Sequence, residues 1–70
     1  RRVGRVAETR RGLAEVTGLD AAAIGDRVLI HSRDEVAGGE VLRLTAGCCS
    51  VLPDASGDGM AIGDRVELLG

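Results

Sequence analysis

The chain has 70 residues, no Phe, Tyr or Trp, and a formal net charge of −2 from nine basic and eleven acidic residues. A chain this short forms one domain and buries only about 60% of the surface that its unfolded form exposes. Two cysteines and one histidine exclude a multi-disulfide framework and a conventional zinc site. The fold must therefore depend on a small aliphatic core.

The first two expected elements are strands at residues 3–8 and 13–17, joined by a hairpin turn at Gly12. Four aliphatic residues of this segment also fit the spacing of a helix: Val3, Val6, Leu13 and Val16. Gly4 and Gly12 would each cost that helix about 1 kcal/mol, so the hairpin is favoured.

Four more strands are expected at residues 27–31, 41–46, 48–52 and 65–69, where short apolar stretches lie between turns rich in glycine. The residues expected to face inward on the first, second and last of these strands are Val28 and Ile30, then Leu42, Leu44 and Ala46, then Val66 and Leu68. Ala14 and Val16 are expected to share a face in the same way. The pattern predicts an all-β fold, a small closed six-stranded barrel formed by residues 1–70 as a single domain.

The sequence AIGDRV occurs twice, at residues 23–28 and 61–66. In each copy the glycine can adopt positive φ, the aspartate can bond to its own turn, and Arg-Val begins a strand. We expect Ile24 and Ile62 to plug the ends of the barrel. Because the flanking sequences do not match at the 38-residue spacing, the repeat indicates a turn used twice and not a duplicated domain.

Asp26, Arg27, Asp64 and Arg65 form the candidate subunit interface, an acidic and basic group expected at one end of the barrel. The alternative is that these charged side chains are solvated at the surface and only make the protein more soluble. No catalytic, cofactor-binding or metal-binding residue is predicted, because the chain contains no P-loop, GxGxxG or CxxC motif.

Several residues with reactive or charged side chains are expected to have structural roles. Residues 54–59 (DASGDG) faintly resemble a calcium loop but lack its ligand order, and are expected to form a surface turn. His31 is expected to end a strand, and Cys48 and Cys49 to be reduced, one pointing inward and one outward. Five arginines lie within the first eleven residues. Because the chain has no lysines or aromatic platforms, they favour a solvated strand edge over a nucleic-acid binding site.

The order of segments resembles the N-terminal β-barrel domain of the rotary ATPase catalytic-subunit superfamily. The resemblance covers nearly the whole chain and is carried by Gly4-Arg5-Val6, GLAEVTGL at 12–19, IGDRVLI, GGEVLRL, Leu52-Pro53 and the second IGDRV. Within the superfamily the chain is most similar to the flagellum-specific ATP synthase, the ATPase of flagellar and type III protein export.

The resemblance implies a barrel that ties a homo-hexameric ring together as its crown, ahead of a domain that binds ATP and Mg²⁺ and hydrolyses ATP. It implies partners among the other flagellar and type III export components and a place in the cytoplasm or at the inner membrane beside the export apparatus. Nucleic-acid binding is not expected. Membrane insertion is not expected either, since no apolar run reaches the roughly 20 residues of a membrane span. Two alternatives stay open: an ATP synthase α or β barrel, and a free-standing barrel that binds single-stranded nucleic acid.

Overall fold

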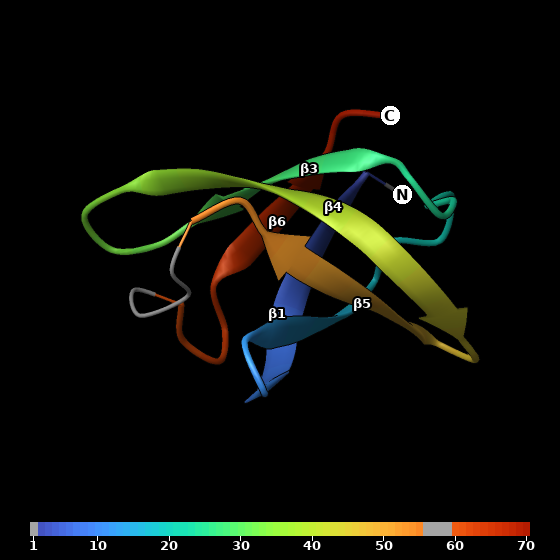
Figure 1. Cartoon of the computed structure of the whole chain (residues 1–70), viewed down its shortest axis with the longest axis horizontal. Helices are drawn as coiled ribbons and strands as arrows, with labels where there is room; N and C mark the ends of the chain where they lie inside the picture. Colours follow the sequence, from blue (N-terminus) through green and yellow to red (C-terminus); the bar gives the residue numbers. More distant parts are fainter. Residues whose placement is uncertain (1, 56–59) are drawn as a thin grey trace.

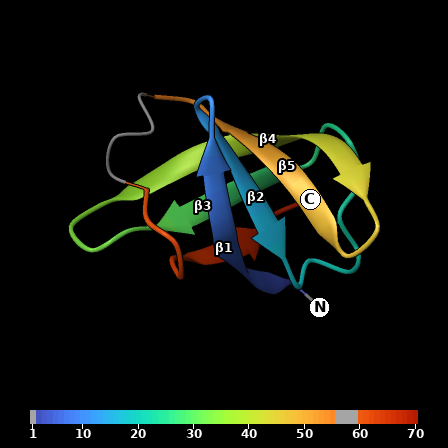
Figure 2. The same cartoon turned by 90° about the horizontal axis from the view of Figure 1, so that it is seen from below.

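The computed structural model describes residues 2–55 and 60–70 and confirms the all-β fold. Its strands are β1 (Val3–Arg10), β2 (Leu13–Thr17), β3 (Arg27–His31), β4 (Val36–Thr45), β5 (Cys48–Pro53) and β6 (Arg65–Leu68). All pairings are antiparallel, and the strands close in the order β1-β2-β5-β4-β3-β6. Figures 1 and 2 show from two perpendicular directions how the strands cross one another around a common interior.

The interior of the barrel is filled by aliphatic side chains. The buried apolar residues are Val6, Ala14, Val16, Leu19, Val28, Ile30, Val41, Cys49, Val51, Val66 and Leu68. They include the predicted inward pairs of β2, β3 and β6, because alternate residues of a strand face the same side. Each of the larger side chains contributes about 1.5–3 kcal/mol when fully buried.

Two halves of the chain have the same pairing pattern, so the barrel has an internal two-fold arrangement. Val6 pairs with Val16 between β1 and β2, and Val41 pairs with Val51 between β4 and β5. Each pairing is followed by a register shift on β1 or β4. The pairing of β6 with β1 matches that of β3 with β4. Gly4 of β1 lies opposite Val66 of β6, and Gly39 of β4 lies opposite Val28 of β3.

This arrangement extends the interpretation of the repeat as a turn used twice, because the strands around the two copies match as well. Matched residues of the two hairpins, such as Val6 and Val41, are 35 positions apart, whereas Val28 and Val66 are 38 apart. The second half therefore has three more residues before its corner than the first (38 − 35 = 3). A single offset cannot align both parts, which is why the flanking sequences appear unrelated.

β4 differs from the prediction in both length and orientation. It begins at Val36, so Gly38 and Gly39 lie inside the strand and not in a turn before it. Val41 is the buried residue, while Leu42 lies at the register shift and is 42% exposed. Leu44 and Ala46, which were also expected to face inward, are exposed as well. A bulge of this kind adds one residue to the strand and changes the phase of the alternation, which an unbroken period of two cannot foresee.

Gly39 permits a close approach between strands that the two-fold arrangement repeats at Gly4. A Cβ atom at Gly39 would lie 2.8 Å from Val51 Cγ1 and 3.1 Å from the Leu52 carbonyl oxygen. At Gly4 it would overlap the Thr17 carbonyl oxygen, which belongs to the backbone and cannot rotate away. The small circumference of the barrel therefore depends on glycine at these two positions, because glycine has no Cβ atom.

Gly39→Ala is expected to lower the free energy of unfolding by about 1–3 kcal/mol, because the added methyl overpacks the core. Gly38→Ala is the matched control, since its methyl would meet only the exposed ends of the Asp54 and Arg27 side chains. Its expected effect is within about 0.5 kcal/mol. Urea unfolding of both variants measures the difference, and equal losses would contradict the close approach at Gly39.

Candidate functional site

The two AIGD segments form the same turn, here called the first corner (residues 23–26) and the second corner (residues 61–64). Gly25 has φ 92° and Gly63 φ 95°, and the aspartate amide donates to the alanine carbonyl at 3.0 Å in the first corner and 3.1 Å in the second. Positive φ at the third residue together with this bond defines a type II turn, which favours glycine there. The conformation predicted from the repeat is thus present in both copies.

The aspartates of the corners serve the turns themselves. Oδ2 of Asp26 accepts the Ala23 amide proton at 2.9 Å, and Oδ2 of Asp64 accepts that of Ala61 at 2.8 Å. Asp64 also accepts a hydrogen bond from the Ser32 hydroxyl at 3.0 Å. Both carboxylates therefore have an internal structural role, whatever else they contact.

The corners lie on opposite sides of the barrel. The Gly25 amide donates to the Val41 carbonyl of β4, and the Gly63 amide donates to the Val6 carbonyl of β1. β1 and β4 are three places apart in a closed ring of six strands, so they face each other across it. In Figure 1 the first corner appears at the right and the second at the lower left. The structure therefore does not bring the four predicted interface residues together at one end.

The arginines that come after the corners have different surroundings. Arg27 Nη1 donates to Asp54 Oδ1 at 3.1 Å, and Nη2 donates to Oδ2, which gives a bidentate ion pair across Gly38. This hydrogen bonding lowers the pKa of Asp54 from its usual 3.8 and raises the pKa of Arg27. Arg65 is exposed and has no ion-pair partner within the described residues. Among the four predicted interface residues, Arg65 is the one whose side chain has no hydrogen-bond or ion-pair partner within the described residues, so its charge is available to solvent or to another molecule.

Ile24 and Ile62 do not plug the barrel, contrary to the prediction. They are 66% and 70% exposed, the largest exposed fractions among the large apolar residues that the structure describes. Each is the second residue of its type II turn. Ala22 and Met60, next to the corners, pack against the core instead.

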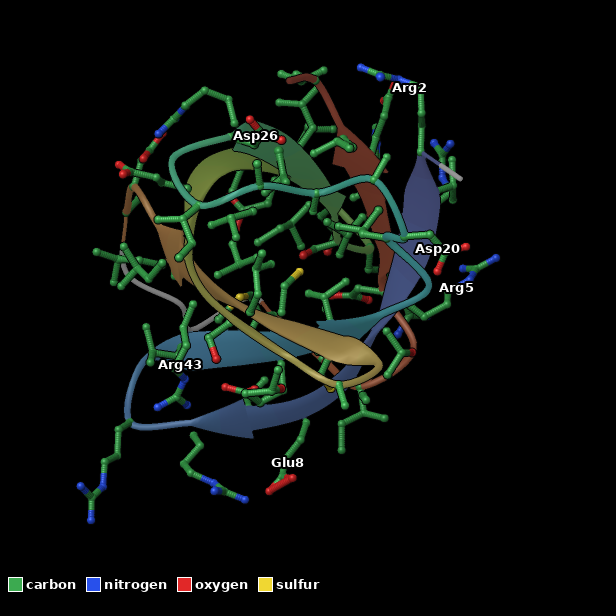
Figure 3. All side chains as sticks on the ribbon, turned by 90° about the vertical axis from the view of Figure 1, so that its right-hand side faces the viewer. Arg2, Arg5, Glu8, Asp20, Asp26 and Arg43 are labelled. Carbon is green, nitrogen blue, oxygen red and sulfur yellow. The ribbon has the colours of Figure 1, made fainter. Side chains whose placement is uncertain are left out.

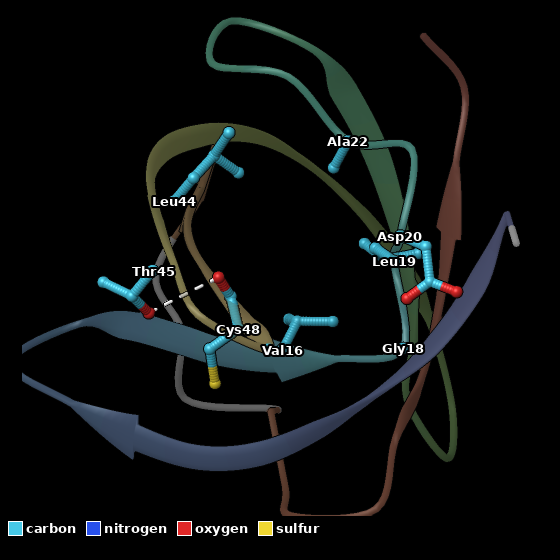
Figure 4. Close-up of a pocket in the computed structure, with 9 residues that line it drawn as sticks. Val16, Gly18, Leu19, Asp20, Ala22, Leu44, Thr45 and Cys48 are labelled. Atoms are coloured by element: carbon cyan, nitrogen blue, oxygen red, sulfur yellow. Dashed lines mark hydrogen bonds between the residues drawn. The ribbon is translucent and has the colours of Figure 1, made fainter.

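A hollow of about 240 Å³ marks the end of the barrel beside the first corner (Figure 4). Leu19 and Ala22 on one side face Leu44 and Val16 on the other. The side-chain hydrogen bond that joins two of its lining residues is a long one, from the Thr45 hydroxyl to the Cys48 carbonyl at 3.5 Å. Asp20, Thr45 and the backbone of Gly18 and Gly47 also line the hollow, so its walls are mixed in polarity. It has the character of an incompletely filled barrel end.

The other reactive side chains have the expected structural positions. His31 ends β3, and its Nε2 lies 3.1 Å from Glu67 Oε1 on β6. Cys49 is buried and Cys48 half-buried, both as free thiols, and burial raises the pKa of Cys49. No group of three or more potential metal ligands occurs among residues 2–55 and 60–70. Most of the predicted surface turn at 54–59 lies outside the described residues.

The arginine-rich start of the chain is divided by the fold. Arg5 donates to the Gly63 carbonyl at 3.3 Å beside the second corner, whereas Arg10 pairs with Glu8 at the far end of β1. Arg10 and Arg11 line a groove with Arg43, which comes from the other half of the sequence. The cluster in the sequence is therefore not a single basic face.

No family model matches the chain, and a search of curated proteins finds no match to its sequence. Residues 2–55 and 60–70 contain no helix with the length and hydropathy of a membrane span. What the structure does supply is a pair of matched corners on opposite sides of the barrel, each with an exposed isoleucine.

Asp26→Ala is expected to lower the free energy of unfolding by about 0.5–1.5 kcal/mol, because the Ala23 amide loses its acceptor. Asp64→Ala should cost more than Asp26→Ala, since the Ser32 hydroxyl loses its acceptor as well. Asp26→Asn keeps an oxygen acceptor and should recover most of the loss. Thermal unfolding of the three variants tests the hydrogen bond from the alanine amide to the aspartate carboxylate. An Asp26→Asn variant as unstable as Asp26→Ala would contradict it.

The carboxyl of Asp54 should titrate below pH 3.8 in the folded protein, as followed by carbon NMR. Because its folded pKa is lowered, the ion pair stabilises the fold above pH 3.8 and loses that effect as the pH falls through the folded value. Arg27→Met should return the pKa of Asp54 to its usual value. The control is Arg65→Met, the matched position of the other half; if it moved Asp54 equally, the pairing would be wrong.

Proposed function

We propose that these 70 residues are the non-catalytic assembly domain, the ring crown, of a hexameric ATPase that drives flagellar or type III protein export. The full-length protein would couple ATP hydrolysis to export, with ATP and Mg²⁺ bound by a domain that comes after the barrel. Its partners would be copies of itself and the other export components, in the cytoplasm or beside the export apparatus at the inner membrane.

The observation that carries this proposal is the placement of Ile24 and Ile62. A ring needs two contact surfaces on opposite sides of each subunit, and the two corners lie on opposite sides. Two isoleucines exposed to 66% and 70% are costly in water and gain when a neighbour covers them. The order of glycines and strands in the sequence adds support from the family resemblance.

The interior of the barrel supports a structural role over a catalytic one. Val6, Val16, Ile30, Val41 and Val51 fill it with at most 1% exposure, and the hollow of about 240 Å³ lies at the end of the barrel beside the first corner. The division of the N-terminal arginines between the two ends of β1 weighs against a continuous track for single-stranded nucleic acid, which needs a charged groove with stacking groups.

The purified chain is expected neither to bind nor to hydrolyse ATP in the presence of Mg²⁺. The reading frame beyond Gly70 should encode a P-loop roughly a hundred residues downstream, and deleting residues 1–70 from that protein should abolish its hexamer. Calorimetry, phosphate release and native mass spectrometry measure these outcomes. Nucleotide turnover by the 70 residues, or a downstream sequence without a P-loop, would overturn the proposal.

A further inference from the structure

The two-fold arrangement allows each charged position around one corner to be compared with its match around the other. On the first side, Arg27 of β3 lies opposite Glu40 of β4. At the matched place on the second side, Arg65 of β6 lies opposite Arg5 of β1. One half therefore has an opposite-charge pair where the other half has a pair of like charges, and like charges directly opposite each other destabilise a sheet.

The opposite-charge pair of the first side is itself incompletely used. Arg27 directs both of its terminal nitrogens to Asp54, so Glu40 is exposed without an ion-pair partner among the described residues. The first side thus presents an available carboxylate, and the second side presents two arginines that no carboxylate in the described part of the chain pairs with. In Figure 3, Asp20 lies on the same side as Arg5, but no ion pair joins them.

Apolar side chains accompany both sets of charges. The first-corner face is defined by Ile24, Glu40 and Leu42, and the second-corner face by Ile62, Arg5 and Arg65. Leu42 is 42% exposed, and its match on β1 is the small Ala7 at the other register shift. The first-corner face is therefore the bulkier and acidic one, and the second-corner face is the smaller and basic one.

We propose that the first-corner face of one copy binds the second-corner face of the next copy, head to tail. This inference deepens the ring-crown function and rests on it for the closure of the ring. Glu40 of one copy would supply the carboxylate that Arg5 and Arg65 lack, and Ile24 and Ile62 would be covered by the same contact. Two first-corner faces would bring Glu40 against Glu40, and two second-corner faces would bring arginines against arginines, so a symmetric dimer is disfavoured.

Head-to-tail contacts have a property that a symmetric dimer lacks, and the chain itself can be used to test it. Ile24→Asp destroys one face and Ile62→Asp the other, and both changes are at exposed turn positions that leave the core intact. Each variant alone should stay monomeric in sedimentation velocity, with an apparent Kd at least about tenfold above that of the unchanged chain. An equimolar mixture should form a one-to-one dimer that grows no further, because only one intact pair of faces remains.

A charge exchange supplies the second arm. Glu40→Arg alone and Arg65→Glu alone should each weaken association, and the double variant Glu40→Arg/Arg65→Glu should restore it, since the two charges then meet in reversed order. Val36→Asp is the matched control, an exposed apolar residue on neither face, and should associate like the unchanged chain.

Three results would overturn this contact: an unchanged chain that is monomeric at millimolar concentration, an Ile24→Asp or Ile62→Asp variant that still dimerises alone, or a mixture that stays monomeric. Circular dichroism of each variant separates lost association from lost folding. These outcomes do not depend on the sequence downstream of Gly70. A missing P-loop with an intact head-to-tail contact would refute the export ATPase and leave the contact standing, while the reverse result would refute the contact alone.

Discussion

Each corner ties the barrel together with two main-chain hydrogen bonds, and the rest of the structure depends on them. In the second corner, the Gly63 amide donates to the Val6 carbonyl at 2.7 Å and the Val6 amide donates to the Asp64 carbonyl at 2.9 Å. The first corner forms the same two bonds with Val41, at 2.8 and 2.9 Å. Each corner thereby extends the ladder between its strand and β1 or β4 by one residue before the chain turns away. The bonds lie beside the register shifts of β1 and β4.

The same geometry determines what the corners present to solvent. In each corner the glycine has positive φ, the aspartate carboxylate accepts the alanine amide of the same turn, and the isoleucine is exposed. The side chains that pack against the core beside the corners are those of Ala22 and Met60. The structural role of the repeat and its exposed apolar surface therefore have one cause, and the two-fold arrangement places the two surfaces on opposite sides of the domain.

Much of the fold could be predicted from the sequence, because six short strands leave a clear alternation of apolar and polar residues. The inward positions of Val28, Ile30, Val66 and Leu68 follow from that alternation alone. β4 was predicted as a strand, but its start at Val36 and its buried Val41 were not, because the bulge at Leu42 changes the phase of the alternation and nothing local marks it. The internal two-fold was hidden by three additional residues in the sequence between β5 and the second corner, although the repeated corner was visible.

The candidate site was less predictable than the fold, because it depends on residues brought together across the barrel. The repeat identified Asp26 and Asp64, but their carboxylates are occupied within the turns. Neither the Asp54 partner of Arg27 nor the contact of Arg5 with the second corner is local in sequence. Once the two halves are aligned with both spacings, however, Glu40 and Arg5 fall at matched positions, and this is the signal that could have indicated them.

Amide hydrogen exchange at Val6 and Val41 tests the central claim most directly. If the corner bonds close the barrel, both amides should be among the slowest in the protein and should open only with global unfolding, at the same free energy as the core amides of β5. Exchange of either amide at the rate of an exposed turn, while the core remains protected, would show that the barrel closes without its corners and would contradict the account.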